Sequence, residues 1–149
     1  MIRSLVLLSF LGACGSSATT SPDAPVDCTN DPRVTAYAAD MAVVGSQGQI
    51  TFTLVAADPA PPGRGLNSWM VELSDASGPV AGAALVVTPY MPEHQHPAGT
   101  LPVVTEPAAG HYMIDMINLW MPGVWQTTIE ATPAGGTKDV AVFGFCVKS

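Results

Sequence analysis

The side chains best suited to chemistry in this sequence are imidazoles and thioethers, and they fall within one stretch. All three histidines and four of the seven methionines lie between positions 91 and 121. Imidazole and thioether donors together favour copper, and the thioether favours the cuprous ion, whereas zinc prefers more histidine or carboxylate. The pattern predicts a copper site if the fold brings several of them together. The residues are Met91, His94, His96, His111, Met113, Met116 and Met121.

Catalysis and nucleic-acid binding are not indicated. Glu93 and Asp115 lie in different motifs and form no convincing acid–base pair. The sequence contains no Ser-His-Asp order, phosphate loop or nucleophile elbow. Acidic residues outnumber basic ones by 12 to 5, for a formal net charge of −7. This balance argues against nucleic acid and anionic lipid headgroups as partners. We therefore expect a protein that is not an enzyme.

The elements that must position these residues are short strands. Apolar and polar residues alternate with the period of two that is typical of a half-buried strand. Gly and Pro turn signals separate the runs. About seven short strands at this spacing predict an all-β fold, an antiparallel immunoglobulin-like β-sandwich. The Gly-His-Tyr triplet at 110–112 also resembles a tyrosine corner. The expected strands are 50–54, 69–74, 80–90, 101–106, 111–120, 124–131 and 140–147, with an edge strand or short helix within 34–44.

Strand direction decides which of the candidate ligands can meet. If 101–106 is a strand and successive strands alternate, the loops after 80–90 and 111–120 lie at the same end of the domain. The Pro-rich loop 58–68 would lie beside them. This end would gather the candidate metal ligands Met91, His94, His96 and Met121.

The other donors are expected to stay apart from this group. His111 begins the strand that ends near Trp120, so at about 3.3 Å per residue it lies roughly 30 Å from that end. Met113 is excluded for the same reason. Met116 has the strand parity of Tyr112, which the pattern places in the core, so we expect Met116 to be a packing residue.

Residues 1–13 have the features of a lipoprotein signal peptide. Arg3 supplies a positive charge, and the apolar run 5–11 is too short to cross a bilayer, which needs about 20 apolar residues. Leu11-Gly12-Ala13-Cys14 resembles the lipobox of bacterial lipoproteins. The resemblance implies cleavage before Cys14 and its diacylation, since one acyl chain anchors only marginally. An ordinary secretory signal with a chance cysteine is the alternative.

The residues after the lipobox predict a lipid-anchored domain on a tether. Residues 14–27 are mostly small, polar and Pro-containing, which predicts a flexible tether and a folded domain at 28–149. Gly15 follows Cys14, and a residue other than Asp at that position resembles an outer-membrane sorting signal. We therefore expect the protein in the cell envelope, anchored to the outer membrane and facing the periplasm.

The cysteine count is consistent with this location. Lipidation of Cys14 would leave Cys28 and Cys146 out of three cysteines. An exported protein lies in an oxidising compartment, so a disulfide is the default expectation for this pair. Two thiolates serving as metal ligands are the alternative.

Five short motifs resemble the YtkA-like domains, small exported β-sandwich modules related to the FixH type. The resemblance covers 67–131. Family members often carry glycines between and after the two histidines, where this sequence has Gln95 and Pro97. Some members are associated with copper or other heavy metals, so the resemblance implies metal binding. The motifs are Asn67-Ser68-Trp69, Ser77-Gly78-Pro79-Val80-Ala81-Gly82-Ala83, Met91-Pro92-Glu93-His94-Gln95-His96, Gly110-His111-Tyr112 and Met121-Pro122-Gly123-Val124-Trp125.

Two functions from different classes therefore stay open. In the first, an exported, lipid-anchored protein binds copper, as the cuprous ion, through the four candidate ligands. In the second, the domain is a structural or protein-interaction module without metal, and its loop 58–68 contacts a protein partner. The second treats both histidines as solvated loop residues and both methionines as flexible core fillers. Either hypothesis places Trp69, Trp120 and Trp125 in the core or at its rim.

Overall fold

The computed structural model describes residues 27, 28 and 30–149. The expected signal peptide, the lipidation site Cys14 and all but the last residue of the expected tether lie outside the described residues. Every regular element from residue 30 onward is a strand. No helix in the described part is long and apolar enough to span a membrane.

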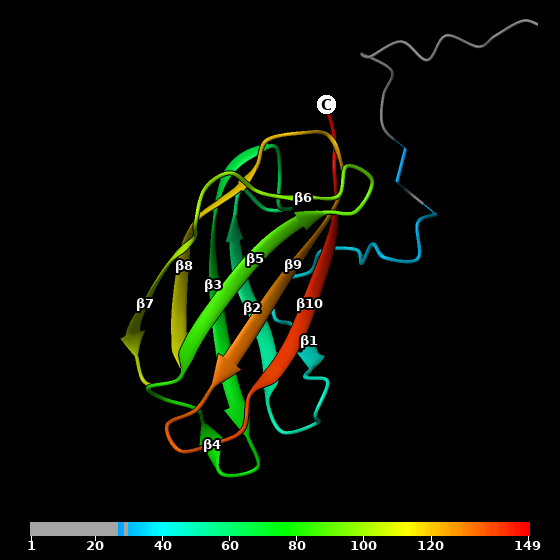
Figure 1. Cartoon of the computed structure of the whole chain (residues 1–149). Helices are drawn as coiled ribbons and strands as arrows, with labels where there is room; N and C mark the ends of the chain where they lie inside the picture. Colours follow the sequence, from blue (N-terminus) through cyan, green and yellow to red (C-terminus); the bar gives the residue numbers. More distant parts are fainter. Residues whose placement is uncertain (1–26, 29) are drawn as a thin grey trace, which may run out of the picture.

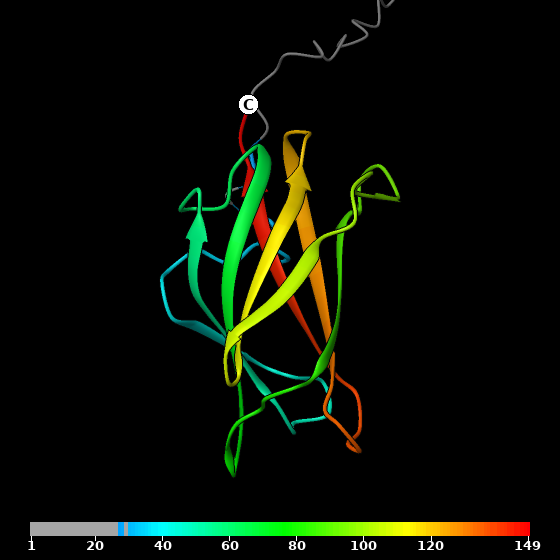
Figure 2. The ribbon, with the colours of Figure 1, turned by 90° about the vertical axis from the view of Figure 1, so that its left-hand side faces the viewer.

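The strands form two antiparallel sheets that pack as a sandwich (Figures 1 and 2). The order within the larger sheet is β1-β2-β3-β8-β7, with β4 paired to β3, and the order within the smaller sheet is β10-β9-β5-β6. The larger sheet contains β1 (Met41–Val44), β2 (Thr51–Asp58), β3 (Gly65–Asp75), β4 (Gly78–Pro79), β7 (Val103–Ala108) and β8 (His111–Leu119). The smaller contains β5 (Ala84–Met91), β6 (His96–Pro97), β9 (Gly123–Thr132) and β10 (Asp139–Val147).

The seven long strands have the arrangement of a constant-type immunoglobulin domain. In that fold the first, second, fifth and fourth strands share one sheet, and the third, sixth and seventh share the other. Here the first group is β2-β3-β8-β7 and the second is β5-β9-β10. The predicted immunoglobulin-like β-sandwich is therefore confirmed. The run expected at 80–90 begins as a strand only at Ala84, and the segment within 34–44 contributes the edge strand β1.

Alternating burial along the strands builds the core between the sheets. In β3, Trp69, Val71 and Leu73 are buried, while the residues between them are partly exposed. The indole of Trp69 packs edge-to-face on Phe145, with ring centroids 5.5 Å apart, and on Phe143 at 6.2 Å. Such contacts add to the burial of large apolar area and join the two sheets.

Met116 is not a core residue, and the prediction that it packs inside is wrong. Its side chain is 42% exposed and its φ is 61°. Between the register pairs Trp69↔Ile114 and Asn67↔Ile117, β8 has one residue more than β3. This bulge turns Met116 outward and restores Ile117 to the core, because one extra residue reverses strand parity.

Tyr112 ties β8 to the connection before β5. Its hydroxyl donates to the carbonyl oxygen of Val80 at 2.8 Å and accepts from the backbone N–H of Ala83 at 2.9 Å. A tyrosine corner lies at the start of the sixth strand, whereas Tyr112 lies near the start of β8, the fifth in this arrangement. The predicted tyrosine corner is therefore wrong, and Tyr112 instead fixes how the chain enters the smaller sheet.

The loops after β5 and β8 lie at the same end of the sandwich, as the strand parity predicts (Figure 1). The β2–β3 loop joins them, since Nε of Arg64 donates to the carbonyl oxygen of Trp120 at 3.0 Å. The N-terminal segment also reaches this end. There the expected disulfide joins Cys28 to Cys146, with Cα atoms 5.5 Å apart. The candidate ligands, the disulfide and the chain's entry into the domain therefore share one end.

Asp139 holds together the opposite end of the sandwich. Its carboxylate is 0% exposed and accepts hydrogen bonds from the backbone N–H groups of Gln47, Gln49, Ile50 and Val140 at 2.8–2.9 Å. Burial acts to raise the pKa of Asp139, but the four N–H donors outweigh it and hold the pKa below its usual value. The β1–β2 turn is thus bound to β10 by one ionised side chain.

Candidate metal centre

A tight turn between β5 and β6 presents both candidate histidines. Met91 ends β5 and is the register partner of His96, which begins β6. The backbone N–H groups of His94 and Gln95 both donate to the carbonyl oxygen of Met91, at 3.2 and 2.9 Å. Gln95 adopts φ 55°, which lets the chain reverse within so few residues. We name the segment 91–97 the histidine turn.

The histidine turn brings its two imidazoles close together. The ring centroids of His94 and His96 lie 5.8 Å apart, with an interplanar angle of 66°. Metal–nitrogen bonds of about 2.0 Å put the centres of two imidazoles that share one ion roughly 5–6 Å apart. The observed separation is therefore compatible with two ligands of a single ion.

Two tryptophans and a carbonyl group orient the ring of His96. The ring stacks on Trp120 at a centroid distance of 5.6 Å and meets the edge of Trp125 at 6.3 Å. Its Nδ1 lies 3.0 Å from the carbonyl oxygen of Pro97. A carbonyl can only accept, so this contact places the proton on Nδ1 and leaves Nε2 of the neutral ring as a free donor of an electron pair. Histidine ligands of metals are commonly oriented in this way.

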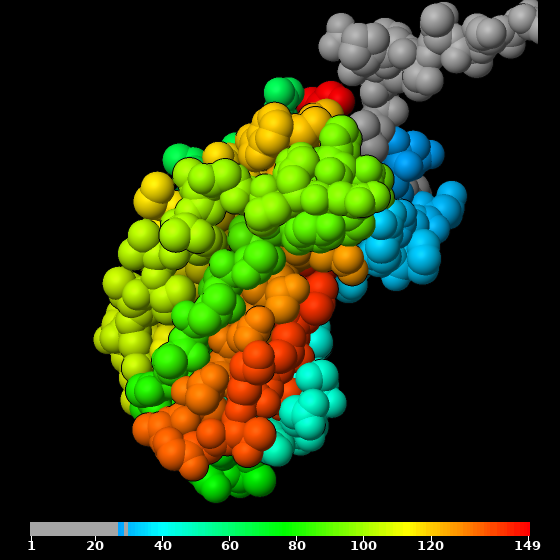
Figure 3. Space-filling view, in the orientation of Figure 1, coloured from blue at the N-terminus to red at the C-terminus, as the bar shows by residue number. Residues whose placement is uncertain are grey.

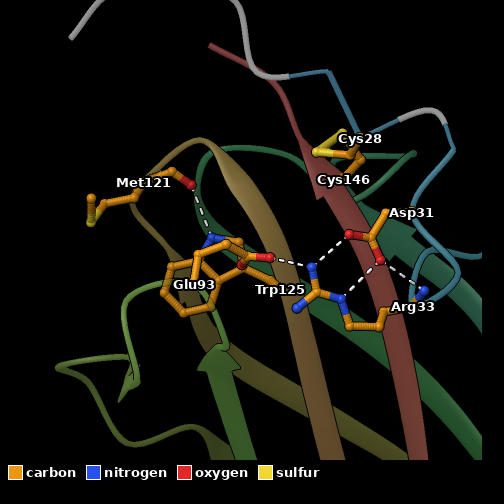
Figure 4. The surroundings of a disulfide bond; sticks show 7 residues. All are labelled: Cys28, Asp31, Arg33, Glu93, Met121, Trp125 and Cys146. Carbon is orange, nitrogen blue, oxygen red and sulfur yellow. Dashed lines mark hydrogen bonds and ion pairs between the residues drawn. A yellow bond between two sulfur atoms is a disulfide. The ribbon is translucent and has the colours of Figure 1, made fainter. Parts of the chain in front are cut away.

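The two candidate methionines lie on the core side of this end. Met91 is 1% exposed, and its methyl group occupies the space that a side chain at Gly123 would fill. Met121 is partly buried against the core, and its carbonyl oxygen accepts from Nε1 of Trp125 at 2.9 Å. In Figure 4 the thioether of Met121 points away from that indole. The structure therefore brings the histidines together and places Met91 in the packing beneath them.

An ion pair connects the histidine turn to the N-terminal segment (Figure 4). Arg33 binds Glu93, the residue before His94, and its Nε also donates to Asp31 at 2.8 Å. These bonds, with Asp31 first and Glu93 second, raise the pKa of Arg33. The hydrogen bond from the Arg33 side chain lowers the pKa of Asp31 to about 2. Arg33 and Glu93 are 60 residues apart in the sequence, and no sequence pattern indicated their contact.

The neighbouring surfaces show how accessible the turn is. Figure 3 shows the face formed by β5, β9 and β10, with the segment that follows β5 lying over its upper end, beside the N-terminal segment. His94 is exposed and His96 partly exposed. Trp120 is 46% exposed and stacks on one face of the His96 ring. An ion could therefore reach the imidazoles without any rearrangement of the core.

Other donors do not join this pair. His111 lies on β8 in the larger sheet, opposite Glu72 in register. The sulfurs of Cys28 and Cys146 are joined to each other and are not thiolate ligands. Among the residues the structure describes, no group of three or more His, Cys, Asp or Glu side chains could hold a metal ion. The arrangement offers two imidazoles, and the two candidate methionines belong to the loops and strand ends at the same end of the sandwich.

Comparison with known sequences assigns the chain to a family. The sequence model of a family described as YtkA-like matches residues 46–130. The match runs from the β1–β2 turn nearly to the end of β9 and contains the whole histidine turn. No curated protein and no solved structure matches the chain.

Proposed function

Since the chain belongs to the YtkA-like family, we propose that it is an exported module of the cell envelope that binds a cuprous ion at the histidine turn. It acts as a binding protein and not as an enzyme. The observation that carries this proposal is the 5.8 Å separation of the His94 and His96 rings, which suits a shared ion without movement of the backbone.

The surroundings of His96 support the proposal. The ring is held by stacking on Trp120, and its Nδ1–H is directed to Pro97, so the ring is ordered and Nε2 keeps its electron pair for a ligand bond. A side chain that is ordered before binding loses less conformational entropy when it binds. His94 is exposed and can rotate to complete the pair. One fixed and one mobile imidazole would let the ion enter and leave from solvent.

We assign the thioether donor of this site to Met121 and a packing role to Met91. Met121 lies on the loop after β8 and is only partly buried, and its flexible side chain has three rotatable bonds. Met91 would have to leave the core to reach the same ion, since it is 1% exposed. Two imidazoles and one thioether favour the cuprous ion over harder divalent ions.

The position of the site supports a role close to a membrane. The N-terminal segment enters the domain at the same end as the histidine turn, and Arg33 joins the two through Glu93 (Figure 4). We propose that lipid on Cys14 anchors the chain to the outer membrane on the periplasmic side. The proposed anchor would then be attached to the domain at the end that carries the metal site.

A protein-interaction module without metal is the competing function. The exposed Leu66, at 61%, and Trp120 provide apolar surface near the β2–β3 loop. Such a module would use these side chains to contact a partner and would not need the imidazoles. The two functions therefore differ in their response to loss of the histidines.

Competition with a chromogenic cuprous chelator tests the proposal. Removing both ligands in the variant His94→Asn/His96→Asn should weaken cuprous binding by at least about 100-fold, because even supporting residues of metal sites contribute about 10–100-fold. The matched control is His111→Asn, which removes a histidine from the other sheet and should bind like the wild type. A double variant that retains wild-type affinity would overturn the proposal and favour the interaction module.

A further inference from the structure

A groove of about 320 Å³ lies on the outer face of the larger sheet, away from the histidine turn. Ala56 and Ala57 of β2 line the groove, and its other lining residues come from β2, β3 and β8. These residues are Asp58, Ser68, Met70, Met113 and Asp115. The combination of two thioethers with two carboxylates is not explained by packing, because this face does not belong to the core.

The two methionines face each other across neighbouring strands. Met70 on β3 is the direct register partner of Met113 on β8. Both are partly exposed and lie between buried residues, so both point to the outer face. Directly opposed residues have Cβ atoms about 4.5–5.5 Å apart. Since both side chains line one groove, their sulfur atoms can approach a single small ion.

The carboxylates give the groove a negative charge next to the sulfurs. Asp58 and Asp115 line it from β2 and β8. The hydroxyl of Ser68 donates to Oδ1 of Asp115 at 2.6 Å, which orients that carboxylate and leaves its second oxygen available. Two negative groups beside an open groove attract cations from solvent.

We propose that this groove is a second metal site, which binds a soft monovalent cation through Met70 and Met113 with Asp115 as an oxygen donor. Thioether ligands select the cuprous ion among biological metals. Calcium and magnesium prefer shells made of oxygen ligands alone, whereas this set contributes two thioether sulfurs, which those hard ions do not favour. None of the described residues that line the groove is aromatic, so it lacks the aromatic cage that recognises alkylated ammonium groups. The site is separate from the histidine turn and does not depend on it.

Methionine methyl spectroscopy tests the second site. The full chain carrying ¹³C in its methionine methyl groups is titrated with Ag⁺, a redox-stable soft cation of the same charge as Cu⁺. The methyl resonances of Met70 and Met113 should move together with one stoichiometry, while that of the exposed Met116 stays unchanged. Met70→Leu and Met113→Leu keep the side-chain volume and remove a sulfur, so each should weaken this binding by at least about tenfold. Met116→Leu is the matched control.

The titration separates this site from the one at the histidine turn. In the His94→Asn/His96→Asn variant, the shifts of Met70 and Met113 should persist. In Met70→Leu/Met113→Leu, the methyl resonance of Met121, the thioether assigned to the histidine turn, should still shift. Shifts of Met70 and Met113 no larger than that of Met116 would overturn the second site. So would Leu variants that fold normally and bind Ag⁺ at this site as the wild type does.

Discussion

The variant Asp139→Asn should unfold at a much lower denaturant concentration than the wild type. Asp139 is 0% exposed, and its carboxylate accepts four backbone hydrogen bonds. Each carboxylate oxygen accepts two N–H groups, with Gln47 and Val140 on Oδ1 and Gln49 and Ile50 on Oδ2. An amide has the same shape but presents NH₂ where one oxygen was. Two of the four N–H groups would then face a donor.

The magnitude follows from the two bonds that are lost. Hydrogen bonds to a charged group contribute about 1.5–3 kcal/mol each, so the free energy of unfolding should fall by about 3–6 kcal/mol. Equilibrium unfolding in urea at pH 7, followed by tryptophan fluorescence, measures this change. Asp75→Asn is the control, because Asp75 is exposed and accepts one bond from the backbone N–H of Ser77, so its loss should cost less.

The stabilities of the wild type and of Asp139→Asn should respond differently to acid. The pKa of Asp139 is lowered in the folded protein, so the unfolded chain binds the proton more readily. The stability from this carboxylate is complete above the unfolded pKa of about 3.9 and is lost as the pH falls through the lower folded value. The difference between wild type and Asp139→Asn should therefore shrink below about pH 4. A difference under about 1 kcal/mol at pH 7, or one that grows in acid, would refute the role given to Asp139.

Three further predictions concern the end that carries the histidine turn. Gly144→Ala should lower stability by about 1–3 kcal/mol in urea unfolding, because a Cβ there would overlap the carbonyl oxygen of Arg33 and displace the N-terminal segment; an unchanged midpoint would contradict this packing. Reducing the Cys28–Cys146 disulfide, which spans 118 residues, should lower the free energy of unfolding by about 5 kcal/mol. Unfolding with and without reductant measures this loss, and equal midpoints would contradict a stabilising role of the disulfide. Trp120→Leu should weaken cuprous binding about 2- to 10-fold by freeing the ring of His96, with little loss of stability because Trp120 is half-exposed; unchanged affinity would show that the stacking does not assist binding.

The alternation of apolar and polar residues is sufficient to predict most of the fold. Alternating burial in runs such as 69–74 is a local property, because a two-residue period needs only one buried face. The shared end of the loops after β5 and β8 followed from strand direction alone, and the structure confirms it. The burial of Met116 was predicted wrongly because a bulge with positive φ reverses strand parity without a marked sequence signal.

Apart from the Cys28–Cys146 disulfide, the side-chain contacts between distant segments could not be predicted from the sequence. Arg33 meets Glu93 only because the N-terminal segment crosses β10, where Thr35 donates to the carbonyl oxygen of Gly144 at 2.9 Å. The pairing of Met70 with Met113 depends on the register of two strands that are not consecutive in the chain. The sequence thus indicated the pair of histidines, which a single turn brings together, but not the surfaces that require long-range register.

Imidazole nitrogen spectroscopy of the full chain tests whether His94 and His96 share a bound cuprous ion. Long-range ¹H–¹⁵N spectra are recorded with increasing Cu⁺ under reducing, oxygen-free conditions. The ring nitrogens of His94 and His96 should change together and reach their end points at the same stoichiometry, while those of His111 on the other sheet keep their positions. Binding of Cu⁺ that leaves both His94 and His96 unchanged, or that moves only one of them, would contradict a shared ion at the histidine turn.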